Sequence, residues 1–136
     1  MTGSHCQAEV RLAGDLTLGD ALRLSLAAVA QLELEAVGRR RLSIIVEELL
    51  ANLIEHGGWN PASEAILRVE QDSGRLRLIL EDNCLAFDPR LADLTQPIPL
   101  RGGGAGLALV RAWADDLTYQ PGPPVNRLAL EYGPLA

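Results

Sequence analysis

Two neighbouring segments with alternating apolar and polar residues limit what this chain can fold into. Residues 64–72 read EAILRVEQD and residues 75–82 read RLRLILED, and only the dipeptide SG separates them. Alternation with a period of two is typical of β-strands, and so short a connection is typical of a hairpin. A second hairpin is predicted near the C-terminus, where residues 116–121 and 126–132 flank the turn sequence GPPV.

Three further segments have the apolar spacing of helices. Residues 18–34 carry leucine and valine at helical intervals, behind possible capping residues, and this helix is expected to end near Gly38. A second helix is predicted over residues 39–56, stopped by two glycines. A third is predicted over residues 105–114. Residues 5–12 alternate weakly and are expected to form a first strand.

This order of elements separates the helices from the hairpins instead of alternating them. The pattern is β-α-α-β-β-loop-α-β-β, which predicts an α+β two-layer sandwich with a mixed, mostly antiparallel sheet covered on one face by three helices. A chain of 136 residues fits one domain, 1–136, without a disulfide or metal staple. Residues 84–104 hold three prolines and a glycine run, and they are interpreted as a loop that covers a ligand.

The charge pattern excludes several classes of function. All 12 basic residues are arginine and the net charge is −6, which argues against non-specific binding to nucleic acid or to anionic membranes. Without lysine the chain cannot form a Walker A phosphate loop. The two cysteines lack metal-ligand spacing, and neither a leader sequence nor a membrane-spanning run is recognised. A soluble cytoplasmic protein is therefore expected.

The glycine run at residues 101–107, RGGGAGL, leaves two interpretations open. A dinucleotide-binding fingerprint is excluded because no strand precedes the glycines and no acidic residue follows about twenty positions later. Exposed glycine amides followed by a helix N-terminus make a phosphate site. The alternative is a flexible surface loop without a ligand.

Three polar residues in the second predicted helix are candidates for ligand binding or catalysis. Glu48, Asn52 and Glu55 stand at positions i, i+4 and i+7, on one face beside the apolar stripe. Asparagine is a poor helix-interior residue, so its presence calls for an explanation. An oxygen ligand for magnesium is one explanation, with Glu48 accepting a proton near a bound phosphate. A solvated helix face is the alternative.

An acidic residue follows the second predicted strand. In LEDNCLAFDP, residues 80–89, Asp82 ends an apolar segment and could accept a hydrogen bond from a base amine inside an apolar pocket. The alternative is an aspartate that caps a turn.

Together these segments resemble a known family. EELLANLIEH (47–56), EDNCLAFDP (81–89) and RGGGAGLALVRAWADDLTYQ (101–120) are similar to the asparagine box and the two glycine boxes of the GHKL ATPase and kinase superfamily. With the ending NRLALEY, the chain most resembles the anti-sigma-factor serine kinases of bacterial partner-switching systems. The resemblance runs from about residue 15 to residue 132.

The resemblance implies the Bergerat ATP-binding fold and a role for each matching residue. Asn52 is expected to hold the magnesium that bridges the ATP phosphates, Glu48 to act as the base, and Asp82 to bind the adenine amine. Residues 90–101 are expected to form a short ATP lid. The remaining nucleotide contacts implied are Ala86, Phe87, Arg101, Gly102, Gly103, Gly104, Gly106 and Leu107.

The resemblance also implies partners. Kinases of this type phosphorylate a serine of a small STAS-type antagonist protein, sequester a sigma factor, and act as homodimers. The chain departs from the first glycine box because Cys84 and Ala86 occupy glycine positions. If the backbone at Cys84 needs a positive φ, a Cβ there weakens adenine binding.

The departure leaves a second function open: a catalytically weak ATP-binding regulator that sequesters a partner without phosphorylating it. A detached ATP-binding domain of a histidine kinase is a third alternative. It is disfavoured because no helix with a phospho-accepting histidine precedes the boxes.

Overall fold

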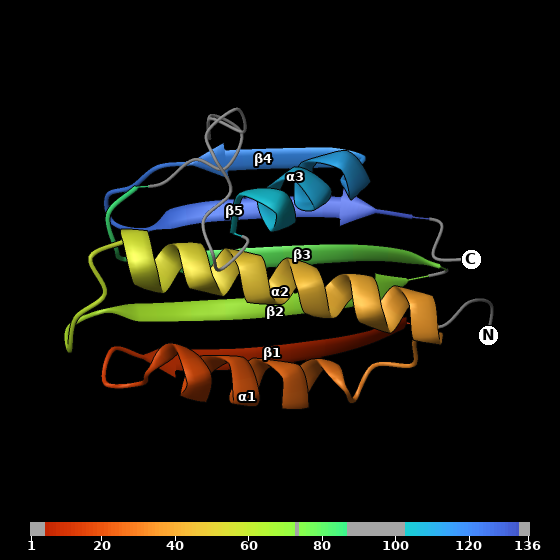
Figure 1. The fold of residues 1–136 in the computed structure, drawn as a ribbon, viewed down its shortest axis with the longest axis horizontal. Coiled ribbons are helices and arrows are strands. Elements are labelled where there is room, and N and C mark those ends of the chain that lie inside the picture. The colour runs from red at the N-terminus through yellow and green to blue at the C-terminus, as the bar shows by residue number, and fades with distance from the viewer. Residues whose placement is uncertain (1–4, 73, 87–102, 134–136) are drawn as a thin grey trace.

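The fold is given by a computed structural model that describes residues 5–72, 74–86 and 103–133. The predicted α+β sandwich is confirmed (Figure 1). The elements are β1 (His5–Ala13), α1 (Leu18–Val29), α2 (Ala36–His56), β2 (Glu64–Asp72), β3 (Arg75–Asp82), α3 (Gly103–Trp113), β4 (Asp116–Gln120) and β5 (Asn126–Tyr132).

The sheet has five strands in the order β1-β2-β3-β5-β4. Both predicted hairpins are present, β2 with β3 and β4 with β5. All four strand pairings are antiparallel, whereas the sequence analysis predicted a mixed, mostly antiparallel sheet. The pairing of β3 with β5 joins the two hairpins and sets Asp82 opposite Asn126.

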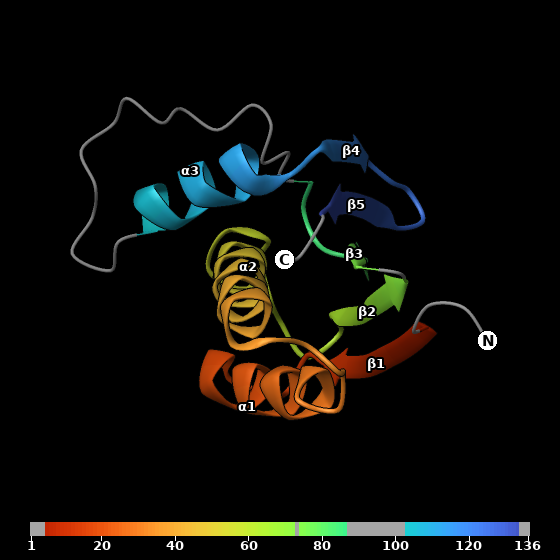
Figure 2. The same cartoon turned by 90° about the vertical axis from the view of Figure 1, so that its right-hand side faces the viewer.

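The three helices cover one face of the sheet (Figure 2). In Figure 1, α2 crosses the middle of the sheet between α1 and α3. The core fills the space between the layers, and its largest fully buried side chains include Leu42, Leu50, Leu67, Leu78 and Leu130. Their burial removes apolar surface from water and is the main force that holds the layers together.

The other face of the sheet carries charged residues. Glu70, Arg77 and Glu131 lie opposite one another on three adjacent strands, and Glu9 pairs with Arg68 at 3.1 Å. Opposite charges in cross-strand positions each contribute a small stabilisation. The alternation seen in the sequence therefore places apolar residues toward the helices and charged residues toward solvent.

The first helix ends earlier than predicted. Thr17 caps α1 through a capping box with Asp20, but the helix ends at Val29 rather than near Gly38. Helix α2 begins at Ala36, so Gly38 lies inside the second helix and stops neither. Leucines after Val29 continue the apolar spacing without helical backbone, which explains the error.

Arg39 stabilises the segment between the two helices. Its guanidinium donates hydrogen bonds to the carbonyl oxygens of Ala30 at 3.2 Å, Leu32 at 3.3 Å and Leu34 at 3.4 Å. The last turn of α1 contains no basic residue of its own. A cation from α2 therefore satisfies carbonyl groups at and beyond the C-terminus of α1, where positive charge is favourable.

Each end of α2 is tied to a neighbouring segment through a tryptophan. Near the C-terminal end, the indole N–H of Trp59 donates to the carbonyl oxygen of Leu16 at 3.1 Å. Near the N-terminal end, the guanidinium of Arg41 lies 5.2 Å from the ring centroid of Trp113, in cation–π contact with the last residue of α3. Helix α2 is thus fixed against both the β1–α1 turn and α3.

The predicted loop at residues 84–104 falls largely outside the described residues, which omit 87–102. The α3 helix begins at Gly103, two residues before the predicted start. Within residues 5–72, 74–86 and 103–133, no helix is long and apolar enough to cross a membrane.

Candidate functional site

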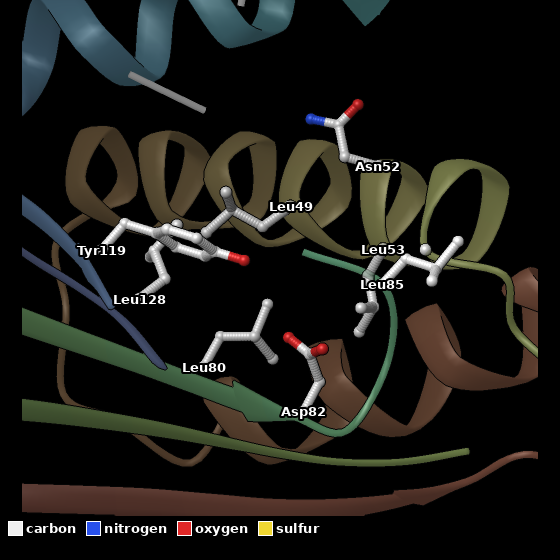
Figure 3. A pocket seen from close by; sticks show the side chains of 9 residues that line it. Leu49, Asn52, Leu53, Leu80, Asp82, Leu85, Tyr119 and Leu128 are labelled. Carbon is white, nitrogen blue, oxygen red and sulfur yellow. The ribbon is translucent and has the colours of Figure 1, made fainter. Parts of the chain in front are cut away.

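A cavity lies between α2 and the sheet, beside the end of β3 (Figure 3). Helix α2 and its cap form one wall, and strands β3, β4 and β5 form the other. Most of the lining is apolar, with one carboxylate, one amide and one phenol. The lining residues are Leu49, Asn52, Leu53, Gly57, Leu80, Asp82, Leu85, Tyr119 and Leu128.

The cavity is narrow. The space open to the centre of a water-sized molecule is about 30 Å³, enough for about two waters. A ligand group as large as a purine must therefore displace part of the wall. Leu85 is the wall residue best suited to move, since its side chain is 67% exposed and leaves little core packing behind.

Asp82 is the charged group of the cavity. It continues the inward-facing series Leu76, Leu78 and Leu80 of β3 and is only 7% exposed. Its Oδ1 accepts hydrogen bonds from the backbone N–H of Cys84 and from Nδ2 of Asn126, both at 2.9 Å. The carboxylate points into the cavity in Figure 3.

The two roles considered for Asp82, turn capping and binding of a base amine, concern different oxygens of its carboxylate. Oδ1 caps the turn through the N–H of Cys84, as the turn-capping interpretation requires. No hydrogen bond reaches Oδ2 from the described part of the chain. Burial raises the pKa of Asp82, while the donors Asn126 and Cys84 act in the opposite direction and favour the ionised form.

Glu48 lies on α2, one turn before Asn52. Its Oε2 is buried and has no hydrogen-bond partner among the described residues. Burial raises the pKa of Glu48, and the nearby carboxylates Glu47 and Glu55 raise it further. A buried oxygen without a partner differs from the solvated helix face considered as the alternative.

Asn52 has the same property. Its Nδ2 is buried without a partner among the described residues, and in Figure 3 its side chain points away from the sheet, on the α3 side of the cavity. Rotating the Asn52 amide by 180° exchanges its nitrogen and its oxygen, so Oδ1 could equally face a cation. The described residues include no group of three or more His, Cys, Asp or Glu that could hold a metal. An amide oxygen is a ligand type that magnesium accepts, so Asn52 fits a cation that would take its other ligands from phosphate or water.

Cys84 does not line this cavity. Its side chain packs against Gly57, where an added Cβ would lie 3.1 Å from the Cβ of Cys84 and 2.4 Å from the carbonyl oxygen of Leu53. It borders a separate hollow together with Ser63 and Asn83. Burial raises the pKa of its thiol, which disfavours the reactive thiolate. Cys84 occupies a glycine position of the first glycine box, and its side chain fits there because Gly57, which it packs against, has no side chain.

The remaining predicted contacts are placed only in part. Ala86 is exposed after β3. The backbone of Gly103, Gly104, Gly106 and Leu107 forms the first turns of α3. Phe87, Arg101 and Gly102 lie outside the described residues.

Two residues at the cavity were missed by sequence reasoning. Tyr119 of β4 lines it, and Asn126 at the start of β5 holds Asp82. A signal for Asn126 is present, because it falls in phase with Leu128 and Leu130 on the buried face of its strand. A polar residue in a buried series needs a partner.

The fold is that of histidine kinase-like ATPase domains. The sequence model described as "Histidine kinase-like ATPase domain" matches residues 12–132, and the chain belongs to this family. Membership implies nucleotide binding. A comparison with curated proteins gives no match.

Two solved structures from Erythrobacter litoralis share the fold. The histidine kinase domain of a blue-light activated histidine kinase aligns with a TM-score of 0.53 and 22% identity over 72% of this chain. A structure of the blue-light activated histidine kinase aligns with a TM-score of 0.56 and 20% identity over 75% of this chain. The alignments span 45% and 32% of those two chains, and identities this low compare the fold alone.

Proposed function

We propose that this chain is an ATP-dependent serine/threonine protein kinase that acts as an anti-sigma factor and phosphorylates a STAS-type antagonist protein. The observation that carries the proposal is that Asp82 and Asn52 both line one cavity, the carboxylate pointing into it and the amide lying on its α3 side. Glu48, whose buried Oε2 has no partner among the described residues, lies one turn before Asn52. The order of the three sequence boxes supports the choice of the anti-sigma kinases within the wider family.

In this proposal the cavity receives adenine. Oδ2 of Asp82 accepts a hydrogen bond from the exocyclic amine, and the apolar walls contact the ring. Asn52 ligates magnesium together with the phosphates, and the magnesium offsets phosphate charge when it is bound. Gly102, Gly103, Gly104 and Gly106 wrap the phosphates, with Arg101 as a further contact, and Ala86, Phe87 and Leu107 complete the nucleotide site.

Glu48 takes the proton in the proposed transfer. The serine oxygen of the substrate forms a bond to the γ-phosphorus as the bond to ADP breaks, and the serine proton passes to the Glu48 carboxylate. A raised pKa suits this role, since a base works best when its pKa is near the working pH. Glu47 and Glu55 contribute to that raised value.

A transfer assay tests the proposal. Purified protein with magnesium and γ-labelled ATP should label a serine of a STAS-type protein encoded beside it. Asn52→Ala should abolish labelling, whereas Asn60→Ala, in the turn after α2 and away from the cavity lining, should leave the transfer chemistry intact. ATP binding without transfer to any such protein would instead favour the regulator that sequesters a partner. No ATP binding would contradict both functions.

A further inference from the structure

Asn126 makes three hydrogen bonds beneath the cavity. It is 4% exposed at the start of β5, directly opposite Asp82 in the strand register. Its Nδ2 donates to Oδ1 of Asp82 at 2.9 Å and to the carbonyl oxygen of Cys84 at 2.8 Å. Its Oδ1 accepts from the backbone N–H of Gly122 at 2.8 Å.

These partners fix the orientation of the amide. Two acceptors face Nδ2 and one donor faces Oδ1, so a flipped amide would set its oxygen against two oxygens and its NH₂ against an N–H. One side chain thereby ties together the end of β3, the segment that follows it and the β4–β5 turn. Asn126→Asp would remove the NH₂ that donates to Asp82. Asn126→Ala would leave Asp82, the carbonyl of Cys84 and the N–H of Gly122 without this partner.

As a consequence, the orientation of the Asp82 carboxylate is fixed, and its two oxygens have different surroundings. Oδ1 is held by two donors, from Asn126 and Cys84, and turning the carboxylate would break both hydrogen bonds. Both donors also favour the ionised carboxylate, which can only accept. A protonated Asp82 could instead donate to a carbonyl group on a purine.

We propose that Asn126 is a positioning residue that makes the cavity select purines with an exocyclic amine over purines with a carbonyl group at the same position. This inference rests on the proposed adenine role of Asp82. Asn126 acts through Asp82, because it does not line the cavity itself.

Nucleotide selectivity provides the test. Binding of magnesium-ATP and magnesium-ITP is measured by calorimetry for the wild-type chain, Asn126→Ala and the control Asn83→Ala. Asn83 makes two comparable hydrogen bonds one residue from Asp82, to the N–H of Glu64 and the carbonyl of Ala62, but none to Asp82. The expected result is a loss of ATP affinity of about tenfold to a hundredfold in Asn126→Ala with a much smaller loss for ITP. Asn83→Ala should keep the wild-type ratio.

Asn126→Asp adds a readout that a purely structural role would not produce. It keeps the size but sets a second carboxylate beside Asp82, so ATP affinity relative to wild type should be low near about pH 8 and recover toward about pH 5, as the pair takes up a proton. Asn126→Ala should show no such recovery.

The possible results distinguish the two proposals. If the wild-type chain binds ATP in preference to ITP and Asn126→Ala weakens both nucleotides equally, the role of Asn126 in selectivity is overturned while the proposed function stands. A flat pH profile for a folded Asn126→Asp overturns it as well. If the wild-type chain binds neither nucleotide, the proposed function itself fails.

Discussion

The two halves of the candidate site differ in how completely they are built without a ligand. In the Asp82 half, formed by Asp82, Cys84, Asn126 and Gly57, polar groups at the base of the cavity bond to one another. In the α2 half, formed by Glu48 and Asn52, a buried oxygen and a buried nitrogen have no partner among the described residues.

This difference shows which half of the site the chain completes without a ligand. A buried polar group without a partner carries a desolvation cost, whereas a bonded one is nearly neutral. The polar groups of the Asp82 half are therefore held in place before a ligand binds. In the α2 half, the buried groups without partners cost desolvation free energy that magnesium and phosphates could offset. Changes in the two halves should therefore affect different measurements.

The largest effect is expected from the α2 half. Glu48→Gln keeps the shape of the side chain but removes the base, so phosphoryl transfer should fall at least about a hundredfold. ATP affinity should change little, because the Asp82 half is untouched. The measurement is single-turnover transfer beside calorimetry, with the exposed change Glu33→Gln, between α1 and α2, as the control. Equal losses in binding and transfer would erase the distinction between the halves.

A change at Asp82 should alter which base is bound. In Asp82→Asn the introduced oxygen would stay with the donors from Cys84 and Asn126, and the introduced NH₂ would face the cavity. ATP affinity should fall by about tenfold to a hundredfold, and ITP should become the preferred ligand because its carbonyl accepts. Competition binding measures the ratio. An unchanged preference would place the base elsewhere.

Gly57→Ala tests whether the Asp82 half is rigid. An added Cβ would lie 2.4 Å from the carbonyl oxygen of Leu53, a backbone atom that cannot move freely. We expect the free energy of unfolding to fall by about 1 to 3 kcal/mol in urea titrations. Gly19→Ala is the matched control, since an added Cβ there would lie 3.8 Å from the side-chain oxygen of Thr17 and alanine favours helix α1. Equal stability of the two variants would contradict close packing at Gly57.

The smallest effect concerns the pH dependence of stability. Because the pKa of Glu48 is raised in the folded chain, the folded state holds that proton more tightly than the unfolded state. The group therefore favours folding below the ordinary glutamate pKa and costs stability as the pH rises through the raised value. Glu48→Gln should gain Tm relative to wild type between about pH 4 and about pH 7. A constant difference in Tm would contradict the shift.

Local pattern predicted most of the fold. The bounds of β2, β3 and β5 match their alternating segments because each strand has one face in the core. The end of α1 was missed because Leu32 is buried outside the helix, so apolar spacing continued after the helical backbone had ended. The carbonyl groups there depend on Arg39, a contact that spacing does not reveal.

The site was predicted unevenly for a similar reason. Asp82 and Asn52 stood out within their own elements, as a carboxylate ending an apolar strand and an amide inside a helix. Asn126 matters only because β5 pairs with β3, which brings it opposite a residue 44 positions away in sequence. Such a strand pairing depends on the whole sheet, so the local sequence pattern around Asn126 does not predict it.

The placement of the two tryptophans gives the protein optical probes at separate ends of α2. Trp59 bonds to the β1–α1 turn near the C-terminal end, and Trp113 stacks with Arg41 near the N-terminal end. The chain has no other tryptophan. With one of them replaced by phenylalanine, emission from the other reports on a single end of the helix, so motions beside the cavity and motions of α3 can be followed as two independent signals.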